Sequence, residues 1–428
     1  MKYAFYTLGC KVNQYETQAM QQALTQRGHT LGSFDKPCDC YIINTCTVTA
    51  VADKKNRNII RRCRRQNPEA IIGVCGCYAQ MAPEDLRKLG VDVIAGSGDR
   101  MAFLNLMEQA ARERVRLESV DRARERYAFE PLPSGSLAER TRAMLKVQDG
   151  CNHFCSYCII PFARGPVRSL PLEDAVAQAI RLRDEGYQEI ILTGIEIASW
   201  GEDLPGQPKL TRLLTAILDA VPALRIRLGS LEPRIIDETF CRTLQGYPNL
   251  CPQFHLSMQS GCDAVLKRMN RHYDTARFYQ SVELLRDSFP GCAITTDMIV
   301  AFPGETEEEF AQSLAFIRKC AFSAMHIFPY SRRPGTVADR MPGQHPNAVK
   351  QERSARAIAV ATELQAAYLQ SLAGSVQAVL FEEADGAYQT GHAPNGVRVW
   401  AEGGDLHNQV RQVRIGTPYQ DGVLGVVE

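Results

Sequence analysis

The sequence predicts an α/β protein in three parts: an open parallel sheet, a partial (β/α)6 barrel and a small all-β barrel. Short apolar runs alternate with helical patterns over most of the 428 residues. A charged, Pro- and Gly-containing stretch interrupts this alternation near residues 112–136, and only short strand patterns follow residue 372. We therefore expect domains at 1–125, 137–372 and 373–428.

The first part reads as a series of βαβ units. Runs rich in Val, Ile and aromatic residues predict strands at 2–7, 41–44, 70–74 and 91–95, and helical spacing predicts helices at 13–27, 51–66 and 83–89. This order predicts a parallel sheet with helices on both faces. The charged residues 112–126, followed by Pro131, Pro133, Ser134, Gly135 and Ser136, are expected to form a linker.

The middle part repeats the alternation at longer spacing. Strands are expected at 143–147, 189–193, 225–228, 253–257, 294–300 and 324–329, and helices at 172–184, 211–220, 276–287 and 306–319. Six such units predict a partial barrel whose functional face lies at the carboxyl ends of the strands.

The last part begins with an Ala-rich segment at 348–372, which follows Pro346 and Asn347, contains no Gly and predicts a long helix. Short strand patterns at 376–382, 396–401 and 410–415 then alternate with Gly-rich turns. These residues predict the small all-β module.

Composition narrows the possible functions. The 49 Lys and Arg residues against 48 Asp and Glu give a net charge of +1. The protein surface as a whole is therefore not basic, and any RNA site must be a local basic patch. No apolar run is long enough for a membrane helix, and MKYAFYTLGCKVNQ lacks the features of a signal peptide, so we expect a cytoplasmic protein without a membrane partner. Fifteen cysteines in such a protein favour metal or cluster chemistry over disulfides.

The strongest motif is CNHFCSYCIIP, which places Cys151, Cys155 and Cys158 on one loop after a predicted strand. Three thiolates can each hold one iron of a [4Fe-4S] cluster and leave the fourth iron free to chelate a small molecule. The alternatives are a structural zinc site, which usually has four closed ligands, or three buried thiols.

A second set of cysteines follows the strands of the first part. Cys10, Cys46 and Cys77 come after three separate strands, whose carboxyl ends meet at one edge of a parallel sheet. Gly9 and Gly76 precede two of them and permit tight turns. Coincident buried thiols are the alternative.

Nine cysteines remain and are expected to be mostly core residues: Cys38, Cys40, Cys63, Cys75, Cys241, Cys251, Cys262, Cys292 and Cys320. Cys75 is the exception, because it lies two residues from Cys77 and could replace it as a ligand.

These motifs together resemble the radical SAM methylthiotransferases over essentially the whole chain. The Cys151, Cys155 and Cys158 spacing matches the radical S-adenosylmethionine signature, and TLGCKVNQYET, NTC and GCYAQ match the three-cysteine amino-terminal domain of that family. RIRLGSLEP, FHLSMQSGCDAVLKRMNR, TTDMIVAFPGETEEEF and FPYSRRPGT resemble its barrel segments. The carboxyl-terminal module, with AVLFEE, resembles the TRAM domain, an RNA-binding β-barrel.

The resemblance implies an enzyme with two [4Fe-4S] clusters and S-adenosylmethionine as cofactors. The cluster on Cys151, Cys155 and Cys158 would cleave S-adenosylmethionine, and the cluster on Cys10, Cys46 and Cys77 would hold the sulfur that is inserted and methylated. All six cysteines are therefore candidate catalytic residues. An electron donor such as a flavodoxin or ferredoxin and a sulfur donor are the implied partners.

The residues after Cys10 help to separate branches of the family. CKVNQ resembles the MtaB type, which modifies threonylcarbamoyladenosine at position 37 of tRNA. Two departures are small: Gly229 stands where the family usually has Ser, and Cys262 often corresponds to Ser. Isopentenyladenosine in tRNA and an aspartate of a ribosomal protein are alternative substrates. A non-catalytic iron-sulfur redox sensor that binds RNA is the alternative of another class.

Two further groups of residues are candidates for binding. Five lie at the ends of predicted barrel strands and are expected to contact cofactor or substrate, with an ordinary turn or an internal ion pair as the alternatives: Thr193, Gly194, Glu232, Gln259 and Asp297. Seven cations lie on the predicted helix after Cys46 and would bind the anticodon stem-loop of tRNA unless they form only a solvated face: Lys54, Lys55, Arg57, Arg61, Arg62, Arg64 and Arg65. The TRAM-like module would add a second RNA contact, or would only pack against the preceding helix.

Overall fold

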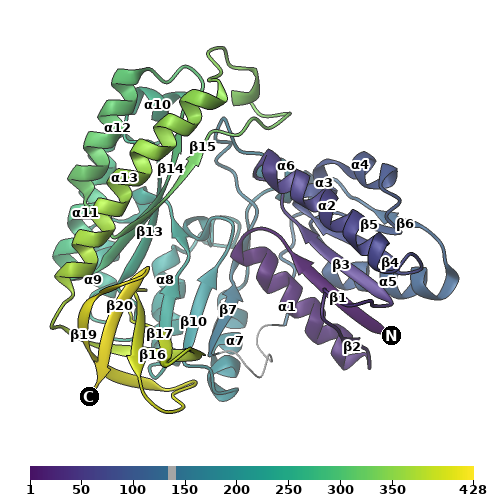
Figure 1. Cartoon of the computed structure of the whole chain (residues 1–428), viewed down its shortest axis with the longest axis horizontal. Helices are drawn as coiled ribbons and strands as arrows, with labels where there is room; N and C mark the ends of the chain where they lie inside the picture. The colour runs from purple at the N-terminus through teal and green to yellow at the C-terminus, as the bar shows by residue number, and fades with distance from the viewer. Residues whose placement is uncertain (134–140) are drawn as a thin grey trace.

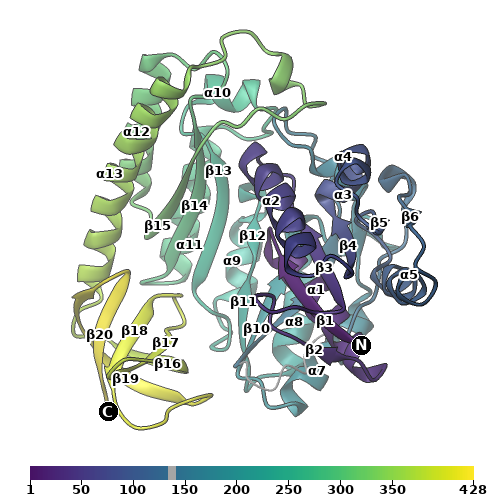
Figure 2. The same cartoon turned by 45° about the vertical axis from the view of Figure 1, so that its right-hand side comes forward.

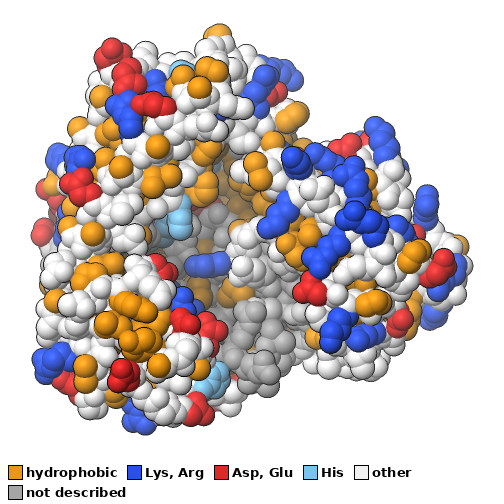
Figure 3. Space-filling model, viewed as in Figure 1, with side chains coloured by type: hydrophobic (Ala, Val, Ile, Leu, Met, Phe, Trp, Pro, Cys, Tyr) orange, Lys and Arg blue, Asp and Glu red, His pale blue; other side chains and the backbone are white. Residues whose placement is uncertain are grey.

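The computed structural model describes residues 1–133 and 141–428 and has the three expected parts. In Figure 1 the first sheet and its helices lie on the right, the partial barrel occupies the centre and left, and the small β-barrel lies below it. Figure 2 shows the first domain in front of the open side of the central barrel. The three parts surround a common hollow, which the space-filling view shows from one side (Figure 3).

The first domain is a six-stranded parallel sheet with strand order β2-β1-β3-β4-β5-β6. Its strands are β1 (Lys2–Thr7), β2 (Thr30–Leu31), β3 (Cys40–Thr45), β4 (Ile71–Gly76), β5 (Val93–Ala95) and β6 (Leu117–Ser119). Helices α1 (Lys11–Gln26) and α5 (Arg100–Glu113) form an apolar core with one face. Helices α2 (Ala50–Gln66), α3 (Cys77–Met81) and α4 (Pro83–Lys88) form the core of the other. The prediction of helices on both faces is confirmed.

The expected linker at residues 112–126 is wrong for most of its length. Helix α5 ends at Glu113, β6 adds an edge strand at Leu117–Ser119, and a short 3-10 helix covers Ala123–Glu125. The many charges concealed this structure because β6 buries little surface and α5 presents Arg and Glu to solvent. Ser134, Gly135 and Ser136 lie outside the described residues.

The central barrel is built from two parallel sheets. One contains β7 (Arg142–Lys146), β10 (Glu189–Thr193) and β11 (Arg225–Leu228), and the other contains β12 (Ser230–Leu231), β13 (Gln253–Gln259), β14 (Ala293–Val300) and β15 (Ala324–Pro329). A bridge between Ile226 and Leu250 connects them. All six expected strands are present, and β7 and β15 end the two sheets without pairing to each other, which makes the barrel partial.

Helices cover the outside of this barrel. They are α7 (Leu172–Asp184), α8 (Leu210–Ala220), α9 (Glu238–Leu244), α10 (Asp263–Arg268), α11 (Thr275–Ser288) and α12 (Glu307–Cys320), and most contribute to one large apolar core. Along β13 and β14, fully buried residues alternate with half-buried ones. The buried set packs against the helices, so the half-buried set faces the barrel interior.

The chain then continues through the expected long helix, α13 (Asn347–Ser371), into a closed five-stranded barrel of order β16-β17-β18-β20-β19. Its strands are β16 (Val376–Asp385), β17 (Tyr388–His392), β18 (Arg398–Glu402), β19 (Val410–Tyr419) and β20 (Gly422–Val427). It docks at the amino ends of the central strands, where Arg142 Nε lies 2.6 Å from Glu382 and Arg225 donates to the carbonyl of Ala378. Among the described residues, no helix is long and apolar enough to cross a membrane.

Candidate active site

Cys10, Cys46 and Cys77 lie together at one edge of the first sheet, as the sequence predicted. Each follows the carboxyl end of a strand: β1, β3 and β4 respectively. A Cβ on Gly9, whose φ is +119°, would lie 2.9 Å from Cys46 Cβ, so only glycine allows these two loops to approach. Gly76, with φ of +98°, precedes Cys77 for the same reason, because a Cβ there would lie 2.5 Å from the carbonyl oxygen of Thr45.

The three thiols form one electrostatic group. Burial raises the pKa of Cys46 to about 12, and its next largest causes include Cys77 and Cys10. Burial also raises the pKa of Cys77, and the Arg164 guanidinium opposes this rise. Two N–H groups donate to these sulfurs: the backbone of Val48 to Cys46 Sγ at 3.5 Å and Arg164 Nε to Cys77 Sγ at 3.3 Å. Cys10 is exposed and Cys77 buried, so the group opens on one side.

Cys75 is not part of this group. Its side chain is fully buried in the apolar core formed with α1 and α5, beside Tyr3, Met20 and Phe103. The charges that act on its pKa are those of Arg100, Glu16, Arg164 and Glu130, not those of the other thiols. The contacts therefore favour Cys77 as the third ligand.

Cys151, Cys155 and Cys158 lie on the loop between β8 (Gln148–Asp149) and α6 (Ile160–Arg164). Burial raises the pKa values of Cys151 and Cys158 to about 12, and the Cys155 thiol adds to the rise of both. Neighbouring segments fix the loop: Arg271 Nη1 donates to Cys155 Sγ at 3.3 Å, and Ser156 donates its backbone N–H to the carbonyl of Met269 at 2.9 Å.

The two sets of thiols fit clusters better than single metal ions. All fifteen cysteines are free, and within the described residues no three His, Cys, Asp or Glu side chains are close enough to hold one ion. A cubane cluster spreads its ligands more widely, because each thiolate binds a different iron. N–H groups that donate to the ligand sulfurs, as Arg164 and Arg271 do here, are typical of iron-sulfur sites.

A cavity of about 280 Å³ is bordered by both cysteine loops. Its wall includes Val48 and Thr49 from the loop after Cys46, and Cys158 from the other set. Cys77 is also among the groups that act on the pKa of Cys158. A molecule in this cavity would therefore contact both cysteine loops.

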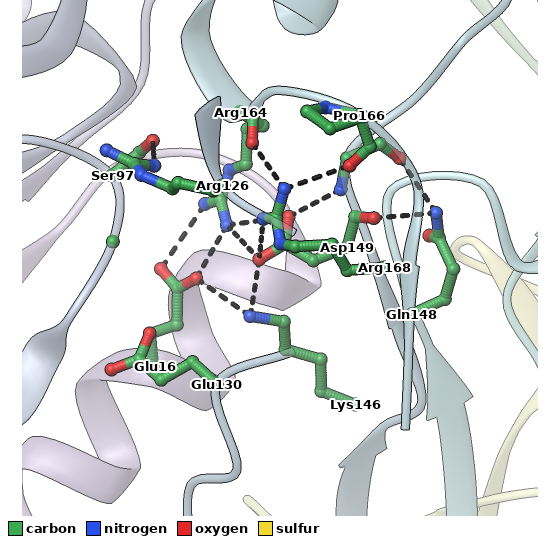
Figure 4. A network of polar contacts seen from close by, with 12 residues as sticks. Glu16, Ser97, Arg126, Glu130, Lys146, Gln148, Asp149, Arg164, Pro166 and Arg168 are labelled. Atoms are coloured by element: carbon green, nitrogen blue, oxygen red, sulfur yellow. Dashed lines mark hydrogen bonds and ion pairs between the residues drawn. The ribbon is translucent and has the colours of Figure 1, made fainter. Parts of the chain in front are cut away.

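A buried ionic network holds the two cysteine loops against each other (Figure 4). At its centre, Glu16 of α1 accepts from Arg164 at 2.6 Å and from Arg100 at 2.8 Å, and Lys146 lies 3.3 Å away. Asp149 pairs with Lys146 at 2.6 Å and also faces Arg164 and Arg168. These cations hold the pKa values of Glu16 and Asp149 well below their usual range despite burial.

Gln259 and Asp297 both line the cavity beside Cys158, from the carboxyl end of β13 and from β14. Gln259 has a φ of +66°, which turns the chain at the strand end. Asp297 lies 3.6 Å from His255 Nε2 on the same inner surface. The structure therefore brings these two predicted residues together with the cysteines.

The other three predicted cofactor residues are engaged by the protein. The carbonyl of Thr193 accepts from Val147, and Gly194 packs so closely on Gln148 that a Cβ would lie 2.9 Å from its side-chain oxygen. Glu232 pairs with Arg234 at 2.9 Å, which is the internal ion pair that the sequence left open.

Among the seven basic residues of α2, four are exposed: Lys54, Lys55, Arg61 and Arg65. Figure 3 shows Lys and Arg side chains gathered on this part of the surface. The other three have protein partners: Arg57 donates to Tyr78, Arg62 pairs with Asp35, and Arg64 pairs with Asp92 at 2.7 Å and donates to three carbonyls. Of these seven described residues, the exposed four are the most open to an RNA phosphate, and Arg61 among them makes only a 3.5 Å hydrogen bond to Asn58.

Three residues of the site were missed from the sequence. Arg164 and Arg271 each donate to a cysteine sulfur, and both are remote in sequence from the partner they contact. Glu196 is buried in the loop after β10, where burial raises its pKa to about 7, assisted by Glu232 and opposed by Arg271. A signal existed for Arg164: a charged residue follows the apolar run IIPFA directly after the last cysteine.

Comparison with known proteins agrees with this geometry. Residues 2–96 match the model of the uncharacterized protein family UPF0004, and residues 145–317 match the radical SAM superfamily. The threonylcarbamoyladenosine tRNA methylthiotransferase MtaB of Bacillus subtilis is 40% identical over 430 residues, which covers 98% of this chain and 95% of that protein. The chain belongs to the radical SAM methylthiotransferase family.

Other relatives in this family include the MtaB protein of Aquifex aeolicus, 38% identical over 82% of this chain and 86% of its own length. A tRNA-2-methylthio-N(6)-dimethylallyladenosine synthase of Caldicellulosiruptor saccharolyticus is 33% identical over 89% of this chain and 82% of its own. The fold is similar to that of TsrM from Kitasatospora setae, a radical S-adenosylmethionine methyltransferase, with a TM-score of 0.56, 16% identity and coverage of 79% and 77%. The protein is thus a radical SAM methylthiotransferase, with S-adenosylmethionine and [4Fe-4S] clusters as its cofactors.

Proposed function

We propose that this enzyme methylthiolates carbon 2 of N6-threonylcarbamoyladenosine at position 37 of tRNA. The observation that carries the proposal is the cavity that both cysteine loops border, because the reaction needs radical formation and sulfur delivery at one carbon. One relative named for this substrate is 40% identical over most of the chain, and two named for dimethylallyladenosine are 33% and 34% identical.

Each set of cysteines would hold one [4Fe-4S] cluster. With clusters bound, Cys151, Cys155 and Cys158 would supply reductive cleavage of S-adenosylmethionine, and Cys10, Cys46 and Cys77 would supply the sulfur that is then methylated. An electron donor and a sulfur donor would be needed from outside the chain.

The chain's own residues would position the reactants. Gln259 and Asp297 present polar groups to the cavity from two barrel strands, where they would orient the adenine or S-adenosylmethionine. Arg271 and Arg164 would hold the sulfurs of Cys155 and Cys77 by hydrogen bonds. Val48 and Thr49 close the wall on the side of the first domain and would exclude water from the reacting carbon.

The tRNA would bind across the basic face of α2. Lys54, Lys55, Arg61 and Arg65 lie on the helix that begins four residues after Cys46, so phosphates of the anticodon stem would be held beside the cavity. The base must leave the stack to enter the cavity, as in other enzymes that act on a base. The small β-barrel, which would add a second RNA contact, lies at the amino ends of the central strands (Figure 1).

The first test is nucleoside mass spectrometry on bulk tRNA from a strain that lacks the gene, with and without complementation. We expect the methylthio form of threonylcarbamoyladenosine to disappear and return. A change confined to the isopentenyl-type nucleoside would move the substrate to that branch. If neither nucleoside changed, a ribosomal-protein substrate or the non-catalytic redox sensor would replace the proposal.

Two cysteine variants separate the roles of the two sets. Cys155→Ala should abolish formation of 5′-deoxyadenosine under strong reductant, whereas Cys77→Ala should preserve it and abolish methylthiolation. Cys75→Ala is the matched control, because that thiol lies in the apolar core, and it should leave both reactions in place. Loss of methylthiolation in Cys75→Ala, with 5′-deoxyadenosine still formed, would contradict the assignment of Cys77.

A further inference from the structure

A second and larger cavity, of about 730 Å³, occupies the other end of the barrel interior. Residues from all three parts of the chain line it, among them Lys11 of α1, Arg142 of β7 and His392 of β17. It corresponds to the hollow at the junction of the three parts in Figure 3.

The two cavities share the same inner barrel surface. On β14, Thr295 lines the larger cavity, and Asp297, two residues later, lines the smaller one beside Cys158. Two residues along a strand span about 7 Å. His255 connects the two levels, because its Nδ1 lies 3.0 Å from Thr295 Oγ1 and its Nε2 lies 3.6 Å from Asp297. A group attached to a base at the level of Asp297 would therefore extend toward the larger cavity.

Among the described cations of this cavity, Lys11 differs in having no hydrogen-bond or ion-pair partner. Arg142 pairs with Glu382, and Arg227 pairs with the buried Glu189 and donates to two carbonyls. In the described part of the chain, Lys11 makes no hydrogen bond or ion pair. Lys11 lines the same cavity as the guanidinium groups of Arg142 and Arg227, whose positive charges repel it. An anion placed here would relieve this repulsion.

We propose that Lys11 binds the carboxylate of the threonylcarbamoyl group, with the rest of that group in the larger cavity. The inference rests on the proposed function, and it assigns recognition of the substituent to the first domain, one residue after Cys10. The adenine would then lie between the two cysteine sets while its substituent lies along the inner surface of β14. The substituent of dimethylallyladenosine carries no charge and would gain nothing from Lys11.

The test is binding of synthetic anticodon stem-loops to the reconstituted holoenzyme, measured by fluorescence anisotropy without turnover. Three RNAs are compared: one with threonylcarbamoyladenosine, one with the methyl ester of its carboxylate, and one with unmodified adenosine. We expect Lys11→Met to weaken binding of the first RNA by about 10-fold or more, as for loss of a hydrogen bond to a charged group, and to leave the other two unchanged. Lys11→Arg should retain most of the affinity.

The matched control is Lys54→Met on the exposed face of α2, which should weaken all three RNAs equally. Equal weakening of all three by Lys11→Met would mean that Lys11 contacts a backbone phosphate, and no weakening would mean that it contacts neither; both results overturn the inference. If the wild-type enzyme itself does not prefer the threonylcarbamoyl RNA, the proposed function fails as well. Normal iron content and circular dichroism of Lys11→Met would exclude a folding defect.

Discussion

The buried carboxylate of Glu16 is predicted to hold the first domain on the barrel. It accepts from Arg164 at 2.6 Å and Arg100 at 2.8 Å, and lies 3.3 Å from Lys146; all four side chains are inaccessible to solvent. Replacing Glu16 by Gln keeps the shape, but it leaves Lys146 and Arg164 with Asp149 as their remaining ion-pair partner and takes from Arg100 the carboxylate that it pairs with. Removing one partner of a buried pair costs about 3–5 kcal/mol, because the remaining charge stays desolvated.

Hydrogen exchange followed by mass spectrometry would measure this effect at α1 and β7, on either side of the interface. A loss of about 3 kcal/mol corresponds to exchange that is faster by about 100-fold. The control is Glu108→Gln on α5, whose pairs with Arg27 and His29 are partly exposed and should contribute no more than about 1 kcal/mol. Equal effects of the two substitutions, or no effect of Glu16→Gln at α1, would refute the argument.

Three further predictions concern acid stability, RNA binding and cluster chemistry. Burial of Glu189 is offset by Arg227 and Arg225, which lower its pKa from 4.5 to about 2. Its ion pairs therefore stabilise the fold above pH 4.5 and are lost as the pH falls toward 2, a difference that corresponds to about 3 kcal/mol. The urea midpoint of unfolding of Glu189→Gln should therefore vary less across this pH interval than that of the wild type. The double variant Arg61→Gln, Arg65→Gln should weaken tRNA binding and reduce the slope of log K against log[salt] by roughly 1–2. The control Arg112→Gln on α5 should change neither quantity, and an unchanged slope in the double variant would mean that Arg61 and Arg65 form only a solvated face. Arg164→Met removes a hydrogen bond and a positive charge from the Cys77 sulfur, so the cluster held by Cys77 should have a lower reduction potential. An EPR redox titration in a Cys155→Ala background, where this is the remaining cluster, would measure the change. An unchanged potential would restrict Arg164 to a structural role.

Regular elements with strong periodicity were predictable from the sequence. Strand β10 (Glu189–Thr193) was expected with its observed bounds, and α13 within one residue at each end, because their patterns fit only one kind of element. The weak elements were missed: β2 has two exposed residues, and β6 is a short polar edge strand. Such strands form because the sheet next to them offers free hydrogen-bonding groups, which is a tertiary effect.

In the candidate site, too, some residues could be predicted from the sequence and others could not. Cys10, Cys46 and Cys77 could be grouped from sequence because the carboxyl ends of parallel strands meet at one edge. The partners of Arg164 could not, since they lie 87 and 148 residues away in the sequence, at Cys77 and Glu16. Likewise, nothing in the pattern of α2 distinguishes Arg64, which is bound to Asp92, from the exposed Arg65.

The interface between the domains, rather than either domain alone, sets the relation between the two groups of cysteines. Arg164 ends the short helix α6, six residues after Cys158, and its side chain contacts Glu16 and Cys77 of the first domain. The buried Arg164 side chain, together with the carboxylate that neutralises it, therefore joins the two cysteine loops. If both clusters act on one carbon, a displacement at this interface would impair sulfur transfer without affecting cleavage of S-adenosylmethionine. Glu16→Gln would then uncouple the two reactions even though Glu16 contacts none of the cysteines.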